Sequence, residues 1–179
     1  MEPLRFGTED GVSLEGELRR PETPAVGSAV ICHAHPRHGG SKDHPILWAL
    51  RNELASRGFV VLAFNFRGTM RSAGTYGAGH TEVKDVAAAI GRVREEAEGP
   101  TIVCGWSFGA NVALREGDVY CPRPRLEALA RTMPKAEVVI VPGTDHFLWH
   151  REKAVAETVG SFAVRTLLSA DGRPDGRQG

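Results

Sequence analysis

The residues best suited to chemistry are residues 105–109, which read Gly-Trp-Ser-Phe-Gly. This G-x-S-x-G pattern is typical of a nucleophile elbow, a tight turn from a strand into a helix that presents a serine hydroxyl above a sheet. A short apolar run at residues 102–104 precedes the pattern, and helix-forming residues 110–114 follow it. Ser107 is therefore the candidate nucleophile, and a plain turn with a surface serine is the structural alternative.

A serine hydroxyl is a weak nucleophile at neutral pH, so it needs a base within hydrogen-bond reach. His146 is the candidate base, because it follows the apolar run at residues 138–141 and the loops after parallel strands meet at one edge of a sheet. The alternative for His146 is a purely structural role in its loop.

A third group must hold the imidazole in the correct tautomer, and the expected chain order is serine, acid, histidine. Asp118 is the candidate acid, because it lies in a loop with a glycine before it and a proline soon after it. Glu116 is the second choice. Asp145 adjoins His146 in the chain, so the two side chains converge poorly, although Asp145 could brace the loop.

An acyl-transfer reaction also needs N–H donors that stabilise a tetrahedral oxyanion. The backbone amide of Phe108, directly after the candidate nucleophile, is the first candidate donor. The second is the amide of His35, in the glycine-containing loop that follows the apolar run at residues 29–32. Pro36, the next residue, has no N–H to offer.

The same loop keeps a metal site open as an alternative, because imidazoles are common metal ligands. His33 and His35 are two residues apart and would point the same way from a strand end. Further ligands could come from His38, Asp43, His44 and His80. No second compact His/Asp motif follows another strand, so structural packing of these rings is favoured, and neither a metal nor a cofactor is expected.

Arg67 follows the apolar run at residues 59–64 and lies in a loop at the same expected edge of the sheet. A buried guanidinium commonly braces neighbouring loops through several hydrogen bonds. This is the favoured interpretation, and binding of an anionic group of a substrate is the alternative.

The elements that must position these residues alternate along the chain. Strands are predicted at residues 11–19, 29–32, 59–64, 102–104 and 138–141, and helical stripes near 45–57, 83–93, 124–129 and 155–167. Continuous apolar runs are typical of parallel strands that are covered on both faces. The sequence therefore predicts an α/β fold, a doubly wound, mostly parallel sheet with helices on both faces.

Composition limits the classes of function. The 179 residues, 41% of them hydrophobic, suit a single domain over residues 1–169, with a frayed polar tail at 170–179. Twenty-two basic residues balance 22 acidic ones, which argues against nucleic acid or an anionic membrane as a partner. No signal-peptide pattern and no membrane span is recognisable, so we expect a cytoplasmic protein. Cys32 and Cys104 lie in apolar runs and are expected to be small buried hydrophobes.

Four motifs in order resemble the α/β-hydrolase superfamily: His-Ala-His-Pro at 33–36 with the glycines at 39–40, Phe-Asn-Phe-Arg-Gly at 64–68, the serine motif at 105–109, and Pro-Gly-Thr-Asp-His-Phe at 142–147. The chain is most similar to the small, lidless bacterial branch related to dienelactone hydrolases and esterases. The resemblance implies a serine hydrolase that cleaves a small carboxylic ester or related acyl substrate through a Ser-His-Asp triad, without a cofactor. A serine nucleophile argues against dienelactone hydrolysis itself, which uses cysteine.

The chain departs from that pattern after the nucleophile helix. The family usually places two further strand–helix units before the acid, and at about 30 residues per unit about 60 residues are absent. Either the strand at 138–141 closes the gap, or an apolar sheet edge is left open to a second copy of the chain, as a homodimer. This shortening motivates the alternative function, a degenerate, non-catalytic binding or interaction domain.

Overall fold

The computed structural model describes residues 1–114, 137, 139, 141–142, 146 and 148–168. The candidate acids Asp118, Glu116 and Asp145 lie outside the described residues, as do the predicted helix near 124–129 and the predicted tail at 170–179. The predicted domain boundary at residue 169 stays a prediction.

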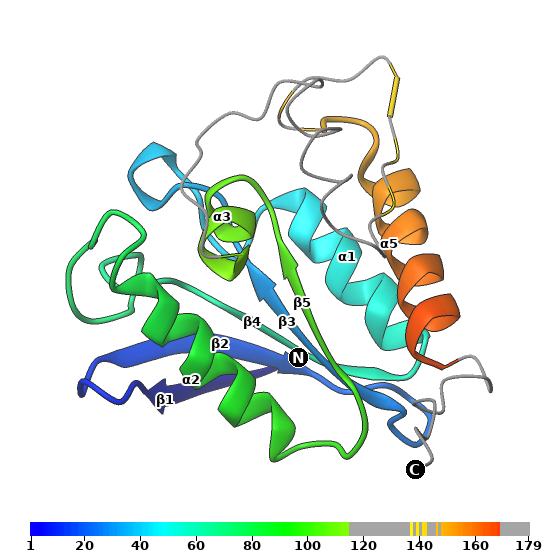
Figure 1. Cartoon of the computed structure of the whole chain (residues 1–179), viewed down its shortest axis with the longest axis horizontal. Helices are drawn as coiled ribbons and strands as arrows, with labels where there is room; N and C mark the ends of the chain where they lie inside the picture. Colours follow the sequence, from blue (N-terminus) through cyan, green and yellow to red (C-terminus); the bar gives the residue numbers. More distant parts are fainter. Residues whose placement is uncertain (115–136, 138, 140, 143–145, 147, 169–179) are drawn as a thin grey trace, which may run out of the picture.

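The described strands form one sheet in the order β1-β2-β4-β3-β5 (Figure 1). They are β1 (Glu2–Gly7), β2 (Ser13–Arg19), β3 (Gly27–Cys32), β4 (Phe59–Phe64) and β5 (Thr101–Gly105). The strands β4, β3 and β5 are parallel, whereas β1 and β2 are antiparallel to their neighbours. All residues of β3 and β4 are buried, as their unbroken apolar runs predict for strands covered on both faces.

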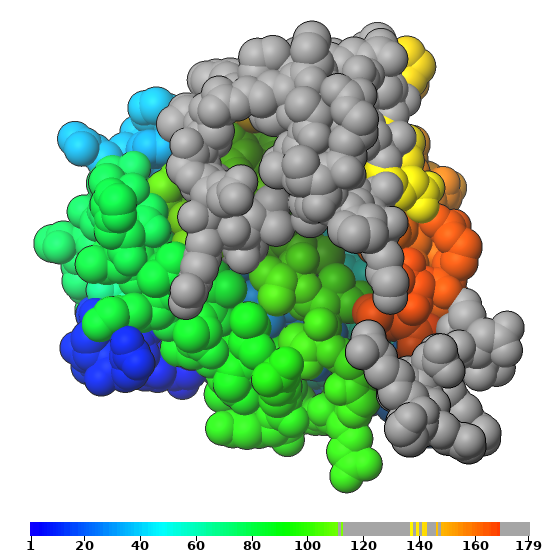
Figure 2. Space-filling view, in the orientation of Figure 1, coloured from blue at the N-terminus to red at the C-terminus, as the bar shows by residue number. Residues whose placement is uncertain are grey.

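Helices cover both faces of this sheet (Figure 1). They are α1 (Pro45–Ser56), α2 (Glu82–Arg94), α3 (Phe108–Leu114) and α5 (Glu152–Leu167), with a 3₁₀ turn η1 (Pro36–His38). One core cluster joins the sheet to α2 and α3, and a second joins it to α1 and α5. In the space-filling view α2 lies on the near face, with the β1–β2 hairpin at its left edge and α5 at the right (Figure 2). The predicted fold class is confirmed.

The start and end of α1 follow from local sequence. Pro45 occupies the first helical turn, where its missing N–H costs nothing, and the side chain of His44 accepts a hydrogen bond from the amide of Ile46. Gly58, just after the helix, has a φ of 93°, a left-handed conformation that favours glycine. The helix therefore begins at the predicted residue and ends one residue before the predicted end.

The strand β1 is not among the strands predicted from the sequence. Its pairing places Phe6 opposite Leu14, and the Phe6 ring packs against Phe64 with centroids 6.0 Å apart. Pro3 is compatible with β1 because this strand is at the edge of the sheet, where a missing N–H breaks no ladder hydrogen bond. The strand is therefore stabilised by tertiary packing, and its short alternation of apolar and polar residues is a weak sequence signal.

The predicted strand at 138–141 is described only at residues 139 and 141, and neither of these belongs to a strand. Within the described part of the chain, β5 pairs with β3 alone, and Val103 on β5 is 36% exposed. Dimerisation through this edge stays a prediction. Among the described helices, none combines the length and the apolar character needed to cross a membrane.

Candidate active site

The serine motif forms the turn that leads from β5 into α3 (Figure 1). Ser107 has a φ of 54°, a left-handed conformation that is costly for a residue with a side chain. A Cβ atom added at Gly105 would lie 2.4 Å from the Cα of Ala110, and one added at Gly109 would lie 2.4 Å from the carbonyl oxygen of Cys32. Both glycines of the motif are therefore required by the close crossing of strand and helix.

The structure brings Ser107 and His146 together. The Nε2 atom of His146 lies 3.0 Å from the Oγ atom of Ser107. The indole Nε1 of Trp106 donates a hydrogen bond of 3.2 Å to the carbonyl oxygen of His146, which ties the histidine to the elbow. A proton can therefore pass directly between the serine hydroxyl and the imidazole.

The loop after β3 holds His35 through a compact hydrogen-bonded turn. The carbonyl oxygen of His35 accepts hydrogen bonds from the amides of His38, at 3.0 Å, and Gly40, at 3.1 Å. A Cβ at Gly40 would lie 2.1 Å from the carbonyl oxygen of Ala34, so the turn requires a glycine there. The rings of His35 and Phe108 are in contact, with centroids 5.2 Å apart. The two residues predicted to supply oxyanion donors are therefore neighbours.

Tyr76 braces this region, although it is not among the residues predicted for the site. The amide of Arg37 donates to Nδ1 of His35, so in the neutral ring the proton is assigned to Nε2, which donates to the Tyr76 hydroxyl at 2.9 Å. Burial, together with the charges of His38 and Arg37, lowers the pKa of His35 and favours this neutral form. No local pattern marks Tyr76, because its partner is 41 residues away.

The segment that carries Tyr76 is anchored by a buried carboxylate. Glu82, at the start of α2, is fully buried and accepts hydrogen bonds from the amides of Gly77, at 2.7 Å, and Gly79, at 2.9 Å. The two backbone N–H groups replace the hydrogen bonds to water that the carboxylate loses on burial. Glu82 therefore fixes the loop beside Phe108.

His33 has a structural role. It is fully buried, its Nδ1 donates to the carbonyl oxygen of Ala34 at 2.6 Å, and its Nε2 accepts from the amide of Phe66 at 3.0 Å. Burial lowers the pKa of His33 to about 4, so the ring is neutral near pH 7. Both ring nitrogens are occupied by backbone groups. Among the described residues, no group of three or more His, Cys, Asp or Glu side chains is arranged to hold a metal ion.

Arg67 braces the loop after β4, as predicted. Its guanidinium contacts Asp85 on α2 at 2.7 Å and Asp10 at 2.9 Å, and the Arg67 side chain is 5% exposed. Burial alone would lower the pKa of Arg67, but the hydrogen bonds to Asp10 and Asp85 raise it above its ordinary value. The hydrogen bond from Arg67, and after it the one from the Thr8 hydroxyl, hold the pKa of Asp10 below its ordinary range.

The cysteines behave as predicted for the described positions. Cys32 and Cys104 are free and buried. Burial raises the pKa of Cys104 to about 12 and raises that of Cys32 as well, so both remain thiols. Neither is suited to nucleophilic chemistry.

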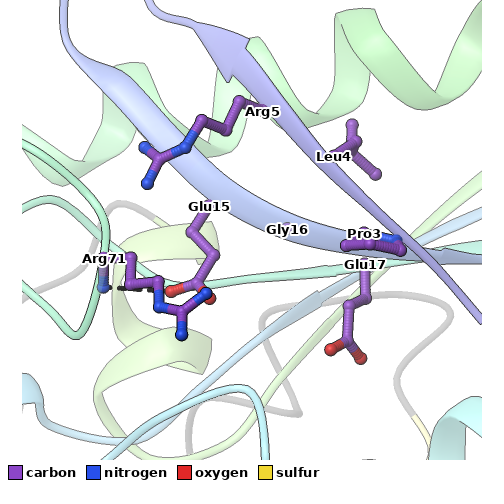
Figure 3. Close-up of a pocket in the computed structure, with 7 residues that line it drawn as sticks. All are labelled: Pro3, Leu4, Arg5, Glu15, Gly16, Glu17 and Arg71. Atoms are coloured by element: carbon purple, nitrogen blue, oxygen red, sulfur yellow. Dashed lines mark hydrogen bonds between the residues drawn. The ribbon is translucent and has the colours of Figure 1, made fainter.

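A separate pocket lies on the β1–β2 hairpin (Figure 3). Its carboxylates take part in contacts within the protein. Glu15 accepts a hydrogen bond from the backbone amide of Arg71, and Glu17 forms ion pairs with Lys42 and Arg51. Neither Ser107 nor His146 lines it. The candidate active site is therefore at the elbow, and the hairpin pocket lies apart from it.

Comparison with known proteins agrees with this geometry. A model described as the alpha/beta hydrolase family matches residues 29–126. A serine hydrolase homologue from Coxiella burnetii superposes with a TM-score of 0.79 at 22% identity, covering 90% of this chain and 96% of that one. A lidless serine hydrolase from Xanthomonas campestris gives 0.77 at 23% identity, covering 96% of each chain. An esterase from Pyrococcus furiosus gives 0.56 at 26% identity, over 67% of this chain and 48% of that one.

None of the curated proteins compared with the chain matches it. The sheet order, the helices on both faces and the strained serine turn define an α/β protein with a nucleophile elbow. The match over residues 29–126 is more specific, and the chain belongs to the alpha/beta hydrolase family.

Proposed function

We propose that this protein hydrolyses small carboxylic esters or related acyl compounds through covalent catalysis at Ser107. The single observation that carries the proposal is the 3.0 Å contact between the Nε2 of His146 and the Oγ of a serine at a φ of 54°. The strained turn exposes the hydroxyl, and the imidazole supplies the base that a serine needs. The names of the similar structures, a serine hydrolase homologue, a serine hydrolase and an esterase, support the same reaction class.

The reaction proceeds in two halves. The Oγ of Ser107 attacks the ester carbonyl while His146 accepts the hydroxyl proton, and the resulting oxyanion accepts hydrogen bonds from the amides of Phe108 and His35. The tetrahedral intermediate collapses, the C–O bond to the alcohol breaks, and His146 returns its proton to the departing alcohol. Water then attacks the acyl-enzyme by the same route and releases the acid and free Ser107. We assign Asp118 to orient His146, and the chemistry needs no cofactor.

An active-site probe tests this proposal directly. A fluorophosphonate reagent is expected to label the native protein, to fail on Ser107→Ala, and to label Ser56→Ala normally. Ser56 is a suitable control because its hydroxyl hydrogen-bonds a carbonyl at the end of α1. Absence of labelling at high reagent concentration would overturn the proposal and favour the non-catalytic domain.

Hydrolysis of a short activated ester is the second test. His146→Ala is expected to lower kcat by a factor on the order of 10⁶, because Ser107 loses its base and the residual rate depends on the oxyanion donors and binding alone. Ester turnover unchanged by both Ser107→Ala and His146→Ala would place any activity elsewhere. Asp118→Asn with the full activity of the native protein would remove Asp118 from the assignment.

A further inference from the structure

Three aromatic side chains form a continuous surface beside the elbow, which we name the aromatic wall. It consists of Trp106, His44 and Trp149. The His44 ring lies between the other two, with its centroid 4.3 Å from that of Trp106 and 5.1 Å from that of Trp149. Trp106 directly precedes Ser107 in the chain. The aromatic wall therefore runs from the elbow that carries Ser107 to Trp149 at the protein surface.

His44 is fixed in the middle of the aromatic wall by its place in the fold. It is the N-cap of α1, and its Nδ1 accepts a hydrogen bond from the amide of Ile46. Burial lowers the pKa of His44, although the nearby charge of Glu152 opposes this, so the neutral ring is favoured near pH 7. A neutral ring held by a hydrogen bond at a helix terminus is a preorganised binding surface, because the side chain loses little rotational freedom when a ligand binds.

The chain holds Trp149 outward at the end of the aromatic wall. Leu148 and His150, on either side of it, have φ values of 58° and 63°, both in the left-handed region. Leu148 packs against the core cluster beneath α1 and α5, while Trp149 remains 44% exposed. Two non-glycine residues in the left-handed region cost stability, and backbone strain of this kind clusters at active sites and ligand-binding surfaces.

The reaction determines which part of the ester lies beside the aromatic wall. His146 must give its proton to the departing alcohol, so the alcohol part of an ester lies on the side of Ser107 where His146 stands. The ring of Trp106 is 6.3 Å from the ring of His146, centroid to centroid. The alcohol part, rather than the acyl part, is therefore the portion adjacent to the aromatic wall.

Resting on the proposed hydrolase function, we propose that the aromatic wall binds a planar aromatic group in the alcohol part of the substrate, as in a benzyl ester. Aromatic pairs add attraction beyond the apolar area they bury, because the ring edge of one complements the face of the other. A saturated ring of similar size buries similar area but lacks that complementarity. The aromatic wall therefore distinguishes planar from saturated rings.

The test compares matched esters. Benzyl acetate and cyclohexylmethyl acetate have alcohols of similar size and reactivity, whereas methyl phenylacetate and methyl cyclohexylacetate move the same rings to the acyl side. We expect kcat/KM for benzyl acetate to exceed that for cyclohexylmethyl acetate by about threefold to tenfold, mainly through KM. The acyl pair is expected to show no comparable preference.

Variants of two similarly exposed tryptophans provide the control. Trp149→Leu is expected to bring the benzyl preference close to one, and Trp149→Phe is expected to restore most of it. Trp48, on α1, is 49% exposed, and Trp48→Leu is expected to keep the preference intact. Thermal melting of each variant separates a loss of the wall from a loss of folding.

The outcomes separate this inference from the function on which it rests. Ester hydrolysis with no benzyl preference, a preference on the acyl side only, or a preference that survives Trp149→Leu would overturn the inference and leave the hydrolase proposal standing. Failure of a fluorophosphonate to label Ser107, with no hydrolysis of any of the four esters, would overturn both. Benzyl alcohol as a stronger competitive inhibitor than cyclohexylmethanol, with the difference lost in Trp149→Leu, would support the inference through binding alone.

Discussion

The buried ring of His33 predicts how the stability of the protein depends on pH. Its pKa is about 4 in the folded protein against an ordinary value of 6.5, because burial disfavours the charged form. Between these two values the unfolded chain binds a proton that the folded chain does not, so unfolding becomes more favourable as the pH falls. The stability is therefore present in full above the ordinary pKa and is lost progressively toward pH 4.

The magnitude follows from the shift. A difference of about 2.5 pKa units corresponds to about 3 kcal/mol, of which about 2.5 kcal/mol is lost by pH 4.5. Replacing His33 with glutamine removes the titration and leaves an oxygen that can accept from the amide of Phe66, the partner of Nε2. The variant loses the bond to Ala34 at every pH, so only the change with pH is diagnostic.

The assay is urea denaturation of native protein and His33→Gln between about pH 8 and pH 4.5. Native protein is expected to lose about 2.5 kcal/mol more unfolding free energy than the variant over this range. His35 and His44, whose pKa values are also lowered, weaken both proteins equally and cancel in the comparison. Equal losses in the two proteins would refute the reasoning from the burial of His33.

Three further substitutions test the supports of the site. Gly109→Ala is expected to lower the unfolding free energy by about 1–3 kcal/mol, because its Cβ would meet a backbone carbonyl; an unchanged urea midpoint would contradict this. Tyr76→Phe removes the acceptor for Nε2 of His35 and is expected to lower kcat about fivefold with little change in KM, and steady-state kinetics would disprove it by showing native kcat. Arg67→Met leaves Asp85 buried without its cation and is expected to cost about 3–5 kcal/mol, whereas the double variant with Asp85→Leu should recover part of that loss in thermal melting.

Local sequence was sufficient to predict the strands and helices that contain an unbroken apolar run or a clear start and stop residue. The run at residues 59–64 became β4 with the predicted bounds, and Pro45 and Gly58 marked the ends of α1 as predicted. The strand β1 was missed because Leu4 and Phe6 become an apolar face only when β2 lies beside them. A strand at a sheet edge depends on its neighbour more than on its own composition.

The hydrogen-bond partners of the histidines in the loop after β3 could not be predicted from the sequence. The spacing of His33 and His35, two residues apart, predicts side chains that point the same way and could share a ligand. In the structure, His33 accepts a hydrogen bond from the amide of Phe66, whereas His35 is hydrogen-bonded to the hydroxyl of Tyr76. These partners come from other segments of the chain, so no spacing within the loop could have distinguished the two rings.

The sequence by itself determined the fold class and the sharp turn at Ser107, because a parallel strand, two glycines and a following helix are local patterns that few conformations satisfy. Only the tertiary structure decided that the imidazole of His146, 39 residues further on, reaches the hydroxyl of Ser107. It also decided that His44 and Trp149 line up with Trp106. Such contacts depend on how separate strands and helices pack, and packing geometry over long sequence separations leaves no pattern in any single stretch of residues.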